Sequence, residues 1–118
     1  MSRRLQRLNV LFRQEIADLI QSELRDPRLG EIISVTRVDV SPDLENASAY
    51  VSILGDEEAK SSTMQALSAA APYVRRCLLR RVRIRRIPAL QFVLDESIEE
   101  AARILDLMKR VSDDDASG

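Results

Sequence analysis

The side chains best suited to chemistry in this sequence are seven arginines within residues 75–86. No acidic residue occurs anywhere between residues 60 and 94. Like charges at neighbouring helical positions destabilise a helix by roughly 0.2–0.5 kcal/mol per pair, so the cluster is costly on its own. The planar guanidinium donates in a fork that matches phosphate oxygens. The stretch therefore predicts contact with an external polyanion such as RNA, through these residues: Arg75, Arg76, Arg80, Arg81, Arg83, Arg85 and Arg86.

A second group of arginines opens the chain. Arg3, Arg4 and Arg7 precede the first acidic residue, Glu15, and cations at a helix N-terminus oppose its dipole. We predict that they also bind RNA. The formal net charge of −1 hides this segregation: residues 1–59 carry seven basic and 11 acidic side chains, residues 60–94 eight and none, and residues 95–118 three and eight.

Two other interpretations of the arginines stay open at this point. They could form a solvated face that pairs with the chain's 19 acidic residues and covers apolar surface with its stems. They could also form a protein-interaction module that docks an acidic protein partner. Low aromatic content, two Phe and two Tyr, argues against a platform that stacks unpaired bases.

Enzymatic and metal chemistry have little support in the sequence. It contains no histidine, one cysteine (Cys77) and three glycines, which disfavour a metal site, a disulfide and a phosphate-binding loop. We therefore expect no enzyme activity, no cofactor and no small-molecule substrate. The sequence has no apolar run of membrane-spanning length and does not start with a secretory signal, so we expect a cytoplasmic protein that is a monomer when free.

Hydrophobic periodicity predicts the elements that position these arginines. An apolar stripe indicates a helix over residues 3–25, and β-branched or alternating segments indicate strands at 31–40, 47–54 and 89–94. A helix is expected over 55–71, and Pro72 is expected to mark a kink at which a third helix begins. A final helix follows Ser97. The expected fold class is α+β, with a single domain over 1–111 and a disordered acidic tail over 112–118.

The element order, with its basic pair of helices, resembles a type II KH domain, in which the joint between the paired helices approaches RNA. A KH domain has a GxxG loop at that joint, whereas this chain reads "LSAAAPYVRR". Over nearly all its length the chain is similar to the ribosome-binding factor A family, bacterial small-subunit maturation proteins with a KH-like fold and a small-residue kink. The resemblance is carried by "RLNVLFRQEIADLIQSELRDPRLG", "ISVTRVDVSPDLENASAYVSILG" and above all "RIRRIPALQFVLDESIEEAARI".

The resemblance implies binding to the small (30S) ribosomal subunit and its 16S rRNA, late in rRNA maturation, with the basic faces on the phosphates. The family's kink usually reads alanine, any residue, glycine. The corresponding residues here are Ala70, Ala71 and Pro72. Proline lacks the backbone donor of glycine and its access to positive φ, so the kink is expected to differ in geometry.

Overall fold

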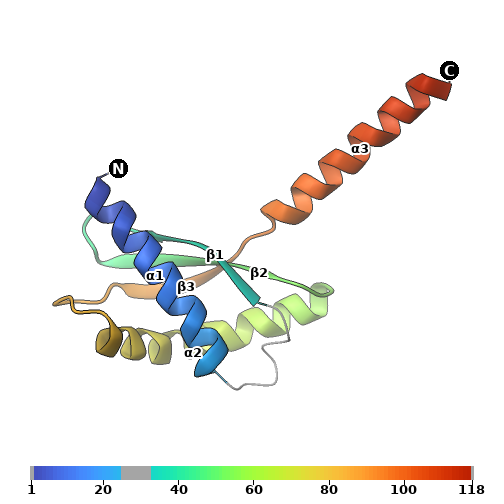
Figure 1. Cartoon of the computed structure of the whole chain (residues 1–118). Helices are drawn as coiled ribbons and strands as arrows, with labels where there is room; N and C mark the ends of the chain where they lie inside the picture. The colour runs from blue at the N-terminus through green and yellow to red at the C-terminus, as the bar shows by residue number, and fades with distance from the viewer. Residues whose placement is uncertain (1, 25–32, 118) are drawn as a thin grey trace.

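The computed structural model describes residues 2–24 and 33–117, and it shows the predicted α+β fold (Figure 1). The elements, in chain order, are α1 (Arg3–Ser22), β1 (Ile33–Val40), β2 (Asn46–Ile53), α2 (Glu57–Arg81), β3 (Ala89–Leu94) and α3 (Ser97–Ser117). The predicted turn at residues 25–30 and the first two residues of the first predicted strand lie outside the described residues. The other two predicted strands match the observed ones to within one residue at each end.

The sheet has the strand order β1-β2-β3, and its two pairings differ in direction. β1 and β2 form an antiparallel hairpin, while β3 runs parallel to β2. A parallel pairing needs a long crossover connection, which α2 provides. The register of β1 shifts between Val35 and Arg37, so Thr36 is an additional residue in the strand, and such bulges redirect side chains.

The core lies between one face of the sheet and the helices α1 and α2, which pack against β1 and β3 and against each other. Phe12 and Ile16 of α1, Val51 of β2, and Leu67 and Leu78 of α2 are almost completely buried there. Phe92 and Cys77 are also buried, as the sequence predicts. The arrangement is a two-layer sandwich that holds the ends of both helices in fixed positions.

The separate third helix that was expected to begin at Pro72 is wrong, because α2 is a single helix from Glu57 to Arg81. Proline removes one backbone donor, so the carbonyl of Ser68 loses its usual helical partner. The buried stripe nevertheless continues across the proline without a change of spacing, since Leu67, Ala71, Val74 and Leu78 all face the core. Packing on both sides of Pro72, which is itself exposed, keeps the helix continuous.

The helix α3 projects away from the sandwich (Figure 1). Every residue from 97 to 112 is exposed. The helix also continues through residues 112–117, where a disordered tail was expected. The division of the chain into a domain over 1–111 and a disordered tail stays a prediction. Within the described ranges, no helix is long and apolar enough to cross a membrane.

Candidate nucleic-acid interface

The arginines at the start of α1 are exposed to solvent. The hydroxyl of Ser2 caps the helix by accepting a hydrogen bond from the backbone N–H of Leu5 at 3.1 Å. Arg3, Arg4 and Arg7 occupy the first two turns, and within residues 2–24 and 33–117 none of them forms an ion pair with a carboxylate. Their charges are therefore available to an external anion.

A second set of exposed arginines lies on the segment between α2 and β3. The helix ends where Val82 adopts an extended backbone, with φ −110° and ψ 126°. Val82 and Ile87 are both buried, at 6% and 2% exposure, and they anchor the two ends of this short segment in the core. Arg83, Arg85 and Arg86 lie between these anchors and are all exposed. Among the described residues they have no carboxylate partner in an ion pair.

The turn between β1 and β2 brings the two sets of arginines to the same end of the molecule (Figure 1). The backbone N–H of Ala89 donates to the carbonyl of Glu45 at 2.9 Å. This hydrogen bond joins the turn to the start of β3, which follows the segment that carries Arg83, Arg85 and Arg86. The pKa of Asp43 lies below its usual value, chiefly because the Ser41 hydroxyl donates to it at 2.6 Å, with a smaller contribution from the positive charge of Arg86. We call the solvent-facing arginines here the arginine end: Arg3, Arg4, Arg7, Arg83, Arg85 and Arg86.

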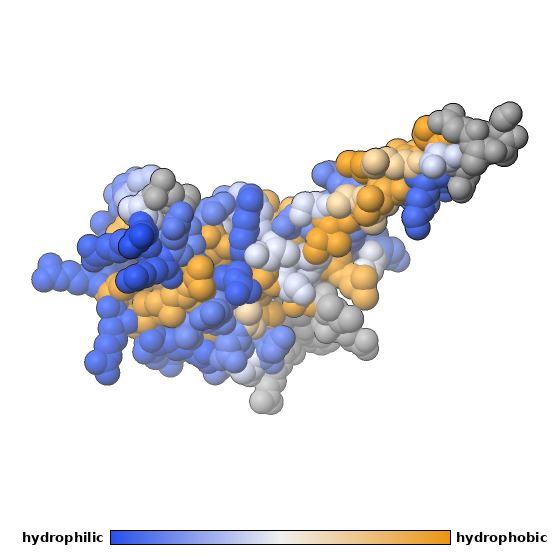
Figure 2. All heavy atoms as spheres, turned by 45° about the horizontal axis from the view of Figure 1, so that its top comes forward, coloured by the Kyte–Doolittle hydropathy of each residue, from blue (hydrophilic) through white to orange (hydrophobic). Residues whose placement is uncertain are grey.

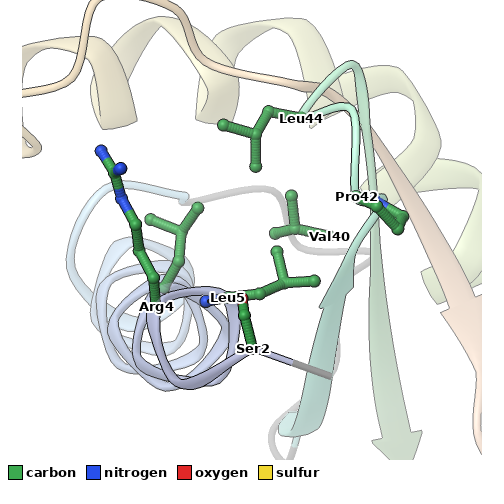
Figure 3. A pocket seen from close by; sticks show the side chains of 7 residues that line it. Ser2, Arg4, Leu5, Val40, Pro42 and Leu44 are labelled. Carbon is green, nitrogen blue, oxygen red and sulfur yellow. Dashed lines mark hydrogen bonds between the residues drawn. The ribbon is translucent and has the colours of Figure 1, made fainter.

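An apolar hollow of about 710 Å³ lies between the start of α1 and the same turn (Figure 3). Leu5, Val40 and Leu44 point into it, and Arg4 stands at its edge. Leu44 has a φ of 62°, in the left-handed region that side chains rarely adopt, and it is 41% exposed. Arg4 of the arginine end therefore borders a mainly apolar hollow.

Two predicted phosphate-binding arginines are engaged by the protein itself. Arg75 donates from Nη2 to the carbonyl of Ile87 at 2.8 Å and from Nε to the carbonyls of Ile87 and Pro88, both at 3.2 Å. Arg81 forms ion pairs with Asp18, with Glu15 at 3.4 Å and with Glu23 at 3.9 Å. Hydrogen bonding to Asp18 is the largest cause that raises the pKa of Arg81. Both residues therefore help to hold the fold together, and their contact with phosphates stays a prediction.

The remaining predicted residues lie on the second half of α2. Arg76 is exposed, with its guanidinium 5.9 Å from the centre of the Tyr73 ring. Arg80 is exposed too, and its Nη2 lies 3.6 Å from the sulfur of Cys77. The hydroxyl of Tyr73 donates to Glu23 at 3.4 Å, so this ring links α2 to the end of α1.

The three residues of the predicted kink lie in the middle of α2. Ala70 is half-buried, Ala71 is buried and Pro72 is exposed. They are one helical turn or more from the charges of Arg76 and Arg80, and no hydrogen bond from their side chains is possible. A direct role of these residues in RNA binding stays a prediction.

The sequence analysis missed two side chains that hold α3 in place. Lys60 is 5% exposed, and its ammonium group donates to Glu99 at 2.7 Å. Asp95 accepts hydrogen bonds from the Ser97 N–H at 2.9 Å and from the Thr36 hydroxyl at 2.7 Å. Hydrogen bonds from Ser97 first and Thr36 second lower the pKa of Asp95 to about 2. The position of Asp95 directly before a predicted helix could have indicated its contact with the start of that helix. No pattern in the sequence indicated that Lys60 is buried and paired with Glu99.

Comparison with known proteins gives consistent matches. The family model described as ribosome-binding factor A matches residues 4–108. The ribosome-binding factor A of Acetivibrio thermocellus is 44% identical over 109 residues, which cover 92% of this chain and 89% of that protein.

Two sets of coordinates for the ribosome-binding factor A of Thermus thermophilus share the fold. The crystal structure of its ribosome-binding factor A superimposes with a TM-score of 0.70 at 34% identity, over 79% of this chain and 97% of that one. A homology model of the same factor, fitted into a cryo-EM map of its complex with the 30S subunit, gives a TM-score of 0.62 at 35% identity, over 75% and 91% of the two chains. By sequence and by fold, the chain belongs to the ribosome-binding factor A family.

Proposed function

We propose that this chain binds the small (30S) ribosomal subunit through phosphates of its 16S rRNA and assists the late maturation of that RNA without catalysing a reaction. The Thermus thermophilus relative that was fitted into a map of a 30S complex supports the choice of partner. The binding surface is the arginine end, together with Arg76 and Arg80 on α2. In this proposal the free chain is a monomer.

The observation that carries the proposal is the set of exposed guanidinium groups that lack a carboxylate partner among the described residues. If the arginines formed only a solvated face, their charges would be paired across the fold, as that of Arg81 is. Instead, Val82 and Ile87 fix a segment from which three arginines face solvent. A rigid cationic surface of this kind suits a polyphosphate, because little conformational entropy is lost when it binds.

The salt dependence of binding tests the proposal. Each neutralised phosphate releases counterions, so about five contacts give a slope of roughly −3.5 to −4.5 in a plot of log K against log salt. We expect such a slope for purified small subunits, measured by co-sedimentation over a series of KCl concentrations. An affinity that does not change with salt would overturn the proposal.

A matched pair of triple variants locates the contacts. The variant R83Q/R85Q/R86Q is expected to weaken binding and to reduce the slope by about 2 to 3, because three phosphate contacts are lost. The control R103Q/K109Q/R110Q removes the same charge from α3, at the opposite end of the molecule, and is expected to keep the slope of the unmodified chain. Equal slopes for both variants would contradict the assignment of the site.

Crosslinking on purified precursors of the small subunit tests the maturation role. We expect crosslinks from the arginine end to 16S rRNA in precursors, and fewer in mature subunits. Binding that survives nuclease digestion of the RNA would instead support an acidic protein as the partner of the arginines.

A further inference from the structure

The apolar hollow beside the arginine end is not used by the proposed phosphate contacts. Apolar side chains from the start of α1 and from the turn between β1 and β2 form its walls: Leu5, Leu8, Val40, Pro42 and Leu44 (Figure 3). Leu5 and Leu8 also pack against the core, which fixes their positions. Figure 2 shows apolar atoms bordered by hydrophilic ones at this end of the molecule. An exposed apolar concavity of this kind indicates a binding site.

The two walls of the hollow are held in place by hydrogen bonds. The side-chain oxygen of Asn9 in α1 accepts from the backbone N–H of Val40 at 2.9 Å, which joins the helix to β1. In the turn, the Leu44 N–H donates to the carbonyl of Ser41 at 2.8 Å. The Ser41 hydroxyl in turn donates to the carboxylate of Asp43 at 2.6 Å. The hollow is therefore preformed, so little ordering is needed when a ligand enters it.

Leu44 is the residue of the turn that points into the hollow (Figure 3). Its φ of 62° is uncommon for residues other than Gly, Asn and Asp. The conformation costs free energy, and yet it leaves the aliphatic side chain 41% exposed instead of buried in the core. A ligand with an apolar surface would bury the rest of this side chain, which accounts for a leucine at this position.

Cations lie on both sides of the hollow. Arg4 at its edge is charged, and among the described residues no carboxylate lines it. On the other side, the lowered pKa of Asp43 results chiefly from the Ser41 hydroxyl, with a smaller contribution from Arg86, whose charge is thus close to the turn. An anionic ligand with an apolar part fits this surface. A second copy of the chain fits it less well, because it would bring its own arginines towards these.

A nucleotide has both parts, a flat base with apolar faces and a phosphate on either side of it. We infer that the hollow admits one unpaired base of the bound RNA, while the flanking phosphates contact Arg4 on one side and Arg86 on the other. The inference rests on the proposed function and adds a base contact to it. RNA is favoured over an acidic peptide because the arginine end already holds phosphates next to the hollow in that proposal.

The walls of the hollow determine what the site distinguishes. Aliphatic side chains offer no hydrogen bonds to the edge of a base, so they do not select one base over another. A paired base is stacked inside a helix and cannot enter, whereas a base in a bulge or a single strand can. The site therefore binds RNA that has not reached its final pairing and releases it when the base pairs, which agrees with a role in maturation.

Three RNA hairpins that differ at one position test the inference with the intact chain. The first carries one bulged adenosine. The second has an abasic site at the bulge, so its phosphates are unchanged, and the third has a uridine opposite the adenosine, which pairs it. We expect the unmodified chain to bind the first hairpin about fivefold more tightly than the other two, near the lower limit for a stacked base. The first two hairpins are expected to give the same salt slope.

A matched pair of leucine variants locates the base. L44N keeps a residue that tolerates positive φ but replaces the apolar wall by a polar one, and it is expected to reduce the preference for the bulged hairpin to less than about twofold. L44G, which removes the side chain, is expected to act in the same way. The control L54N changes an exposed leucine just after β2, at the end of the strand away from the turn, and is expected to keep the preference. Neither leucine belongs to the core, so circular dichroism is expected to show folded proteins.

The inference is overturned if the unmodified chain binds the bulged and abasic hairpins equally, or if L44N and L44G keep the full preference. It is also overturned if L44N loses affinity for small subunits while it keeps the preference among the hairpins, since a segment of a ribosomal protein would then occupy the hollow. A dimer in sedimentation equilibrium that L44N converts to a monomer would assign the hollow to a second copy instead.

The R83Q/R85Q/R86Q variant separates this inference from the proposed function. If that variant binds small subunits with unchanged affinity and salt slope, the phosphate-binding role fails, while a preference of the unmodified chain for the bulged hairpin stands by itself. If the slope falls as expected but the bulged and abasic hairpins bind equally, the proposed function stands and only the base site fails.

Discussion

Arg75 connects α2 to the start of β3 by donating to two consecutive backbone carbonyls, those of Ile87 and Pro88. The substitution R75Q leaves these partly buried acceptors without their charged donor, so we expect the free energy of unfolding to fall by about 1–3 kcal/mol. R75K is expected to restore only part of the loss, because a lysine lacks the planar fork. Urea unfolding measures the effect. The exposed control R76Q is expected to stay within about 0.5 kcal/mol of the unmodified chain, and equal stability of R75Q would show that the contacts contribute nothing.

The carboxylate of Asp95 makes the free energy of unfolding depend on pH. Its pKa is about 2 in the folded chain, below its ordinary value of 3.8, so its contribution is fully present above about pH 4 and is lost as the pH falls through 2. The substitution D95N removes this contribution. We expect the variant to be less stable than the unmodified chain by roughly 1–2 kcal/mol at pH 7, and the difference to shrink towards pH 2. Urea unfolding at pH 7, 4 and 2.5 checks this, and a difference independent of pH would exclude the charge as its cause.

The candidate site was predictable from sequence only in part. A stretch without acidic residues indicates where positive charge gathers, and the exposed Arg83, Arg85 and Arg86 agree with it. It does not indicate which guanidinium groups the fold engages. Arg81 meets Asp18 only because α1 and α2 pack side by side, and these residues are 63 positions apart in the chain. Pairing at such a separation leaves no signal in a single sequence.

At the scale of elements, local pattern predicted most of the fold. Alternation gave β3 at residues 89–94 and the second strand of the hairpin to within one residue. The pattern was misleading at Pro72. The helix-breaking tendency of this one residue competed with the packing of the eight buried residues of a 25-residue helix, and the packing prevailed. Periodicity also showed that α3 is amphipathic, but it contains no information on what covers the apolar side.

The proline inside α2 has a cost that substitution should reveal. In P72A the backbone N–H of residue 72 can donate to the carbonyl of Ser68, and no packing is lost because Pro72 is exposed. We expect the free energy of unfolding to rise by about 1–3 kcal/mol, measured by urea unfolding. A protein that becomes more stable but binds small subunits less tightly would show that the proline sets the direction of Arg76 and Arg80. A loss of stability would contradict this account of the helix.

At the scale of the whole molecule, charge is divided between two ends. The arginine end gathers cations from α1 and from the segment before β3, whereas α3 lies at the other end, and residues 95–118 carry eight acidic and three basic side chains (Figure 1). The formal net charge of −1 therefore says little about affinity for RNA. An orientation follows from this division: the arginine end is attracted to phosphates and the acidic end is repelled from them, so the molecule approaches a ribonucleoprotein surface in one preferred direction.

Truncation after Glu96 separates the two ends in one experiment. The core contains no residue of α3, so residues 1–96 are expected to fold, with a loss of roughly 1–3 kcal/mol for the Lys60–Glu99 contact. The truncation removes six acidic and three basic side chains, which changes the formal net charge from −1 to +2. Affinity for protein-free 16S rRNA is therefore expected to rise several-fold at low salt and to converge with that of the full chain at high salt, where screening is short-ranged. Filter binding over a series of KCl concentrations measures this change. A fall in affinity would show that α3 serves the RNA-binding surface itself.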